Sequence, residues 1–308
     1  MSESNKQQGA VQTTGHSWDG DLQEFNNPLP TWWLWGFYAT VVFALIYWLM
    51  YPAWPIGRDY TKGFLRSITY TTEDGRQVET HWNTRAKLIK EMTEGEDALK
   101  MKAYLDKVAV ASYDEILGDP DMMAFTRSQA KGLFGDNCAP CHGAGGTGVI
   151  GLFPNLADDV WLWGGAVDRI QETIAEGRLG FMPAFARTLD DEQLEDVAHF
   201  VLGLSGHEVD ADRAARGKRI FTGETGGCYY CHTKEGTGLQ SQGAANLTDS
   251  IWEVANVPAA RDLDGKLSAV KQVVRNGIER KMPAWKDRLS DAQIKLLTVY
   301  VHELGGGQ

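Results

Sequence analysis

A run of twenty uncharged residues, 32–51, is the first clear pattern along this chain. It lies between Pro30 and Pro52, and tryptophan and tyrosine side chains gather at both of its ends. A helix of that length spans the hydrocarbon core of a bilayer, and such aromatic residues favour the interfaces. We therefore predict a transmembrane helix over 31–52, preceded by an N-terminal segment over 1–30. A cleaved signal peptide is disfavoured, because the run is too long and no Ala-x-Ala site follows it.

The C-terminal part shows helical periodicity instead of a continuous apolar run. Apolar residues recur at three- and four-residue steps from Leu194 to Leu202, and again from Ile294 to Val301. This spacing predicts two amphipathic helices, each with acidic residues at its start. Strand signals are nearly absent, so the fold class is predicted to be all-α. Between 53 and 125 the helical pattern is weaker, and Ser112 to Glu115 form a predicted capping box.

An internal repeat organises residues 126–308. Asn155 and Trp161 return as Asn246 and Trp252, at an offset of 91, while Leu189 returns as Leu289 at an offset of 100. Two small helical domains are therefore predicted, over 126–206 and 207–308, joined to the membrane helix by a partly helical tether over 53–125. Small residues at Ala130 and Gly217 would let a first helix cross a terminal helix closely, with Phe200 or Tyr300 as the aromatic partner.

Each repeat contains Cys-x-x-Cys-His, and the two copies use all four cysteines of the chain. Paired thiols followed by histidine indicate thioether attachment of haem c, with the imidazole as an iron ligand. Zinc binding is the alternative for paired cysteines, but the motifs lie 90 residues apart and both carry the histidine. We therefore predict two covalently bound haem c groups. The predicted attachment residues and proximal ligands are Cys138, Cys141 and His142, and Cys228, Cys231 and His232.

Each repeat also offers a Met-Pro sequence after its haem motif. Met182 and Met282 occupy equivalent repeat positions, whereas the other six methionines do not recur in this way. A thioether is a soft ligand that raises the haem potential and fills the sixth site on the iron. Met182 and Met282 are therefore the predicted distal ligands. No catalytic residue is predicted.

A small-x-x-x-Phe sequence, the haem motif and Met-Pro, in that order, make each repeat resemble a class I cytochrome c domain. In that family a proline carbonyl often accepts the Nδ1 proton of the proximal histidine. Pro154 matches this position in the first repeat, whereas Ala245 stands there in the second. The resemblance thus implies that this departure separates the two haem potentials.

Charge is uneven along the chain, whose formal net charge is −11. Residues 126–206 carry five basic and eleven acidic side chains, whereas 207–308 carry fourteen and thirteen. An acidic first domain would attract a basic partner such as a donor cytochrome c, although acidic surfaces also serve solubility. The negative balance disfavours nucleic acid as a partner.

The N-terminal sequence adds a more specific resemblance. The segments Gly15 to Gly20 and Glu24 to Trp33, with one membrane span and tandem haem motifs, are similar to the dihaem subunit of cbb3-type cytochrome c oxidases. That resemblance implies an electron relay from a donor cytochrome c to the monohaem and catalytic subunits of a proton-pumping oxidase, with no oxygen chemistry of its own. A free-standing membrane dihaem carrier and a dihaem peroxidase are the alternatives.

Two signals conflict on orientation. Arg58, Lys62 and Arg66 follow the predicted span, whereas only Lys6 precedes it, so the positive-inside rule places the C-terminal part in the cytoplasm. Bacterial haem c is attached on the periplasmic side, and we give this chemistry precedence. The expected location is the bacterial inner membrane, with a single pass and periplasmic haem domains.

Overall fold

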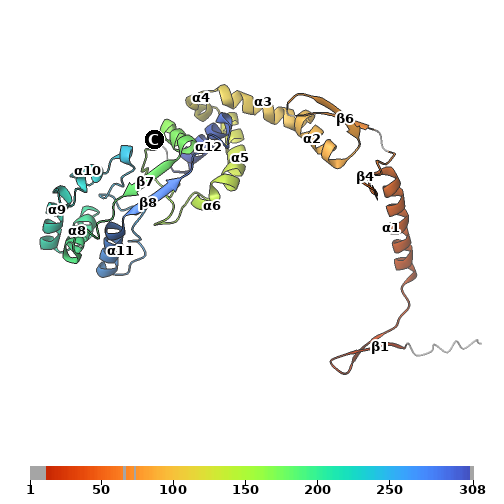
Figure 1. Ribbon diagram of the computed structural model, residues 1–308, viewed down its shortest axis with the longest axis horizontal. Coiled ribbons are helices and arrows are strands. Elements are labelled where there is room, and N and C mark those ends of the chain that lie inside the picture. Colours follow the sequence, from red (N-terminus) through yellow and green to blue (C-terminus); the bar gives the residue numbers. More distant parts are fainter. Residues whose placement is uncertain (1–11, 65–66, 73, 306–308) are drawn as a thin grey trace, which may run out of the picture. The chain divides into compact units, whose positions relative to one another are not determined.

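The computed structural model describes residues 12–64, 67–72 and 74–305. The chain forms two compact units, Met1–Lys100 and Met101–Gln308 (Figure 1). Residues 1–11 of the expected N-terminal segment and residues 306–308 of the second repeat lie outside the described residues.

A long apolar helix, α1 (Thr31–Met50), dominates the first unit. It begins directly after Pro30, and its backbone becomes extended at Tyr51, before Pro52. None of its residues is buried, although nearly all are apolar. Within the described residues, this is the one helix long and apolar enough to cross a membrane. The prediction of an apolar spanning helix here is confirmed in its position and length.

Short hairpins account for much of the rest of this unit. Its other elements are β1 (Thr13–Trp18), β2 (Leu22–Phe25), β3 (Pro55–Ile56), β4 (Asp59–Tyr60), β5 (Ser67–Thr71), β6 (Gln77–His81), α2 (Thr84–Glu94) and the beginning of α3 (Glu96–Val110). Each successive pair of strands forms an antiparallel two-stranded sheet. The β5–β6 hairpin was not predicted, although Asp74-Gly75 between alternating residues is a hairpin signal. Gly75 supplies the positive φ, +80°, that the turn requires.

The second unit is mainly helical and contains both repeats. The first repeat comprises α5 (Pro120–Asn137), α6 (Ala139–His142), α7 (Val167–Glu176), β7 (Arg178–Met182) and α8 (Asp191–Leu204). The second comprises α9 (Ala211–Thr222), α10 (Tyr229–His232), a 3-10 turn (Gln240–Gln242), α11 (Leu263–Asn276), β8 (Ile278–Met282) and α12 (Asp291–Leu304). The matching order of elements confirms the predicted all-α tandem organisation.

The two repeats exchange their final segments across one antiparallel strand pair. In this pair of β7 and β8, Arg178 lies opposite Met282, Gly180 opposite Arg280, and Met182 opposite Ile278. Beyond the pair, α8 packs against α9 and α11 of the second repeat, and α12 packs against α5 and α7 of the first (Figure 1). Each folded half therefore combines segments of both repeats. The expectation that 126–206 and 207–308 each fold on themselves is wrong for these last helices.

Buried apolar contacts hold each exchanged helix in place. In the first half, Ile294 and Leu297 of α12 join Phe134 of α5 and Ile170 of α7 in one buried cluster. In the second half, the corresponding cluster joins α8 to Phe221 of α9 and to the apolar face of α11. The same types of residue meet in both halves, so the exchange is reciprocal.

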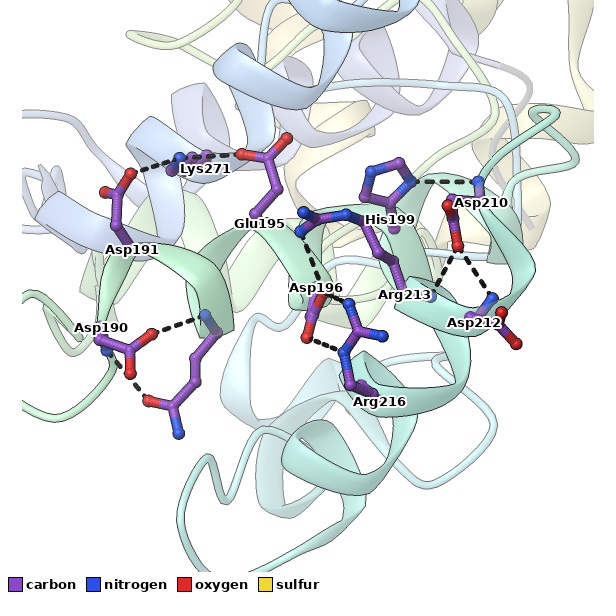
Figure 2. Close-up of polar contacts among 11 residues, drawn as sticks. Asp190, Asp191, Glu195, Asp196, His199, Asp210, Asp212, Arg213, Arg216 and Lys271 are labelled. Atoms are coloured by element: carbon purple, nitrogen blue, oxygen red, sulfur yellow. Dashed lines mark hydrogen bonds and ion pairs between the residues drawn. The ribbon is translucent and has the colours of Figure 1, made fainter.

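Charged side chains also attach α8 to the second repeat (Figure 2). Asp196 of α8 is 3% exposed and accepts two hydrogen bonds from Arg216 of α9, at 2.7 and 2.9 Å, and one from Arg213 at 3.2 Å. On the neighbouring side, Lys271 of α11 donates to Asp191 at 2.9 Å and to Glu195 at 2.8 Å. A buried carboxylate needs such compensation, because an unpaired charge would be costly to bury.

Glycines at the helix crossings and crossover points make the exchange sterically possible. A Cβ atom at Gly217 would collide with the Asp196 carbonyl of α8, which explains the small residue at this crossing. Gly177 and Gly277 follow α7 and α11 with φ of +71° and +70°. A Cβ at Gly277 would lie 2.6 Å from the Met182 carbonyl oxygen, and one at Gly177 would collide with that of Met282. The predicted small-residue crossings are therefore present, but they join different repeats.

A short helix, α4 (Tyr113–Gly118), completes the first half. Its predicted capping box is confirmed: the Glu115 backbone N–H donates to the Ser112 hydroxyl at 3.2 Å, and the Glu115 carboxylate accepts from the Ser112 N–H at 2.7 Å. Val108 and Ile116 are fully buried against α5 and α12. The C-terminal part of the predicted tether is thus packed into the second unit.

Candidate functional site

Both Cys-x-x-Cys-His motifs form a single helical turn. Cys138 ends α5 and begins α6, and the His142 N–H donates to the Cys138 carbonyl at 2.9 Å. The second motif has the same geometry, with His232 N–H donating to the Cys228 carbonyl at 2.9 Å. Three-residue spacing on a helix places both thiols on one face, which suits attachment to the two vinyl positions of one haem edge.

The proximal histidines are oriented by backbone carbonyls. His142 Nδ1 lies 3.0 Å from the Pro154 carbonyl oxygen, and His232 Nδ1 lies 2.9 Å from that of Ala245. A carbonyl can only accept, so Nδ1 carries the proton and Nε2 keeps a lone pair for iron. Burial also lowers the pKa of both imidazoles below the ordinary value, which favours the neutral form that binds metal. The predicted role of the Pro154 position is confirmed, and Ala245 fills it equally well.

Glycines bring those carbonyls close to the motifs. Gly148 and Gly238 have φ of +60° and +76°, and their N–H groups donate to the carbonyls of His142 and His232 at 2.8 and 3.0 Å. Any side chain at Gly148 would collide with the Pro154 carbonyl, and one at Gly238 with that of Ala244. Both loops therefore need glycine to hold the imidazole acceptors in place.

The cysteines are not arranged for zinc. Burial raises the pKa of Cys138 and Cys228 to about 11, so both are neutral thiols near pH 7. Across the described part of the chain, no three histidine, cysteine or acidic side chains come together in a group suited to a metal ion. The two motifs lie in separate halves, which fits one haem attachment at each.

The exchange places each methionine with the other repeat's haem motif. Met282 packs on the buried cluster that Cys138 and Phe134 also contact. Met182 packs on the buried cluster that includes Phe221, and Cys228 packs on the same cluster. A backbone hydrogen bond also joins the two repeats here: the Trp285 N–H donates to the Ile174 carbonyl at 3.1 Å. Sequence order suggested the opposite pairing, because each methionine follows the motif of its own repeat.

An unpaired polar group supports a haem in the first half. Trp161 Nε1 is buried and has no hydrogen-bond partner among the residues that the structure describes. An indole N–H is a donor only, and buried donors are normally satisfied, so an acceptor such as a haem propionate suits this position. Two cysteines, an oriented imidazole, a soft sulfur and this donor together fit haem c.

One polar residue near this site was missed by the sequence analysis. Glu253 is only 6% exposed and follows Trp252, so it occupies the repeat position of Leu162. Its carboxylate reaches the first repeat, where it accepts a hydrogen bond from the Asn155 N–H at 3.1 Å. In the sequence, the one indication of a special role for Glu253 is an acidic residue where the other repeat has leucine.

These folds and ligand sets define a tandem class I cytochrome c behind an apolar N-terminal helix. The family model for the "N-terminal domain of cytochrome oxidase-cbb3, FixP" matches residues 10–58, and that for "Cytochrome C oxidase, cbb3-type, subunit III" matches 126–201 and 212–301. The chain therefore belongs to the family of subunit III of cbb3-type cytochrome c oxidases. It is a membrane-anchored cytochrome c subunit of such an oxidase.

Full-length relatives agree with this assignment. The chain is 42% identical to the cbb3-type cytochrome c oxidase subunit FixP of Azorhizobium caulinodans over 97% of this chain and 95% of that protein. It is 38% identical to subunit CcoP of Azospirillum brasilense, covering 97% and 96% of the two chains. With CcoP of Cereibacter sphaeroides it shares 36% identity over 97% of each.

Proposed function

We propose that this chain carries two haem c groups and relays electrons from a donor cytochrome c to the other subunits of its oxidase. The four motif cysteines would hold the haems through thioethers, and His142 and His232 would supply the proximal nitrogens. When bound, each haem supplies a one-electron couple, and the chain itself performs no oxygen chemistry. The observation that carries this proposal is the presence of two matching sites, each with an oriented imidazole and an available sulfur.

The distal ligands are crossed between the repeats. Met282 would ligate the haem attached at Cys138 and Cys141, and Met182 the haem attached at Cys228 and Cys231. The reciprocal packing of the two methionines on these motifs supports this pairing. Soft sulfur ligands favour reduced iron and leave no open site for oxygen or peroxide. Ligation that is unchanged by electron transfer also keeps reorganisation small, which suits a relay.

The strand pair gives the relay a rigid connection. Each methionine terminates a strand whose partner strand terminates in the other methionine. Neither haem site can therefore move without disturbing the β7–β8 hydrogen bonds and the exchanged helices. A fixed geometry between two redox groups favours electron transfer at a constant rate over transfer that is gated by domain motion.

The partners follow from the family. Relatives are named as subunits of cbb3-type oxidases, so we infer that this chain docks with a monohaem cytochrome subunit and with the catalytic subunit of a proton-pumping complex. The formal net charge of −11 suits a basic donor cytochrome c.

The proposed location is the inner membrane, with both haem halves in the periplasm and α1 as the single anchor. Fusion of alkaline phosphatase to the C-terminus tests this topology. An active fusion is the expected result, and an inactive one at normal expression would place the haem halves in the cytoplasm.

Haem stoichiometry tests the relay. The tagged chain is extracted from native membranes in mild detergent, and reduced pyridine spectra give its ratio of c-type to b-type haem. We expect three c-type haems per copy of this chain, two on the chain and one on the monohaem subunit, together with b-type haem from the catalytic subunit. Two c-type haems without b-type haem would indicate a free-standing carrier, and fewer than three in an assembly that contains b-type haem would contradict the ligand assignment.

A further inference from the structure

Glu253 is a buried acid that the relay described so far does not use. It lies between α10 and α11 of the second repeat and is 6% exposed. Both its backbone and its side chain contact the first repeat: its carbonyl accepts from the Gly151 N–H at 3.1 Å, and its Oε2 atom accepts from the Asn155 N–H at 3.1 Å. A buried carboxyl that bridges two repeats has a cost, which suggests a specific role.

The contact at Asn155 leads directly to a haem ligand. Asn155 follows Pro154, whose carbonyl oxygen lies 3.0 Å from His142 Nδ1. Glu253 thus binds the N–H of the same peptide group whose carbonyl orients this imidazole. Hydrogen bonding to Nδ1 controls how strongly a histidine donates to its metal, so a charge bound to this loop influences the iron.

The second haem site lacks an equivalent acid. The residue in the matching repeat position is Leu162, which has no group to accept from the Asn246 N–H. His232 still has its carbonyl partner, Ala245. The two sites therefore share their types of ligand and their orienting carbonyls, but the Glu253 carboxyl is present at the first site alone.

The surroundings of Glu253 favour a proton that can be gained or lost near neutral pH. Burial, with a further contribution from the Asp158 carboxylate, raises the pKa of Glu253 to about 7. The Asn155 N–H and the positive charge of Arg280 on β8 act in the opposite direction. Asp158 and Arg280 are the charged groups that face this carboxyl from the adjoining loop and strand.

On the basis of the haem placement above, we propose that Glu253 is a positioning residue that sets the potential of the haem at Cys138 and Cys141, and couples its reduction to the uptake of a proton. As one electron arrives from a reduced donor cytochrome, the Glu253 carboxylate takes one proton from water. The added negative charge attracts that proton, and the protonated acid in turn stabilises the reduced site. The haem at Cys228 and Cys231 has no such coupling, so the two potentials separate as the pH changes.

The test is a spectroelectrochemical titration of the c-type haems in the intact, detergent-solubilised assembly at several pH values on both sides of about 7. We expect the potential of one haem of this chain to fall as the pH rises, while that of its other haem stays level. Replacement of Cys228 and Cys231 by alanine identifies the pH-dependent component, which should be the one that remains.

Two variants distinguish the effect of a proton on Glu253 from the effect of its packing. Glu253→Gln keeps an oxygen that can accept from Asn155 but cannot titrate, and it should abolish the slope. Glu279→Gln removes an exposed acid from β8 and should leave the slope unchanged. Equal slopes in the unaltered chain and in Glu253→Gln would overturn the proposal, as would level potentials in both.

A second measurement needs no variant. Reduced-minus-oxidised infrared spectra of the unaltered assembly should show a protonated carboxyl appearing on reduction, and the absence of that signal would overturn the proposal even if Glu253→Gln failed to fold. Pyridine spectra keep this result distinct from the function proposed above. A chain with two haems and level potentials would refute the coupling alone, whereas a chain without haem would refute both.

Discussion

Replacing one methionine at a time tests the crossed ligand pairs. In a chain with Cys228 and Cys231 replaced by alanine, only the motif at Cys138 and Cys141 can hold a haem. In this background we expect Met282→Leu to lower the midpoint potential of the remaining haem and Met182→Leu to leave it unchanged. Leucine has nearly the volume of methionine, so the packing is largely kept while the sulfur is lost.

The expected shift is large compared with the packing cost. Axial ligands move haem potentials over about 0.8 V, and we assign roughly a quarter of that range, about 0.2 V, to loss of the thioether. For a one-electron couple this is about 5 kcal/mol of preference for reduced iron, at 59 mV per tenfold change. The Met-to-Leu exchange itself costs less than about 1.5 kcal/mol. Met282 packs on the cluster beside Cys138, whereas Met182 packs on the cluster beside Cys228. Met282→Leu should therefore produce nearly the whole shift in the midpoint potential of the remaining haem.

The assay combines redox titration with carbon monoxide difference spectra of the single-haem chain. Loss of the true sixth ligand should both lower the potential and open the iron to carbon monoxide. The reciprocal background, with Cys138 and Cys141 replaced by alanine, should reverse the roles of the two methionines, and Met92→Leu, an exposed site in α2, should change nothing. A lowered potential with Met182→Leu in the first background would refute the exchange.

Three further predictions concern stability. Gly177→Ala should lower the free energy of unfolding by about 1–3 kcal/mol, because it adds a side chain at positive φ beside a β8 carbonyl. Gly180→Ala in β7 should lower it less, because a Cβ there meets only the Arg280 carbonyl oxygen, at 3.9 Å, and chemical denaturation compares the two variants. Asp196→Ala should lower the free energy of unfolding by about 2 kcal/mol, because it leaves two partly exposed arginines of α9 unpaired. Asp212→Ala, at an exposed position, should lower it less in the same assay. Hydrogen bonds from neighbouring arginines, that of β7 foremost, lower the pKa of Glu172 from 4.5 to about 2, so the native state gains stability above pH 4.5 that is lost as the pH falls toward 2. Glu172→Gln should reduce this loss in melting temperatures measured at acidic pH. An unchanged fall of the melting temperature with acid would contradict the pairing.

Local chemistry made much of this protein predictable from its sequence. Spanning helices and haem attachment depend on short contiguous patterns, so the apolar run, the two Cys-x-x-Cys-His motifs and the Met-Pro sequences were recognisable without a fold. The same holds for the Ser112 capping box, which needs only four residues. The β5–β6 hairpin was not predicted although its Asp-Gly turn is present in the sequence, because the strong helical periodicity elsewhere led to the prediction of an all-α fold class.

The partners of the terminal helices could not be derived in this way. Both repeats present a small residue on the first helix and an aromatic residue on the last, so α8 and α12 suit either half about equally well. Ala130 meets Leu296 and Val299 from the far end of the chain, and Gly217 meets Asp196 and Phe200 from the preceding repeat. Periodicity specifies which face of a helix is buried, but not which equivalent surface covers it.

The sequence by itself thus determined the apolar N-terminal helix, the helical repeats and the candidate haem ligands, because each depends on residues near one another in the chain. Only the tertiary structure decided which methionine meets which motif and that Glu253 reaches the loop beside Pro154. The physical reason lies in β7 and β8: their pairing directs each chain segment into the opposite half, and contacts between residues as far apart as Asn155 and Glu253 exist only after that crossing.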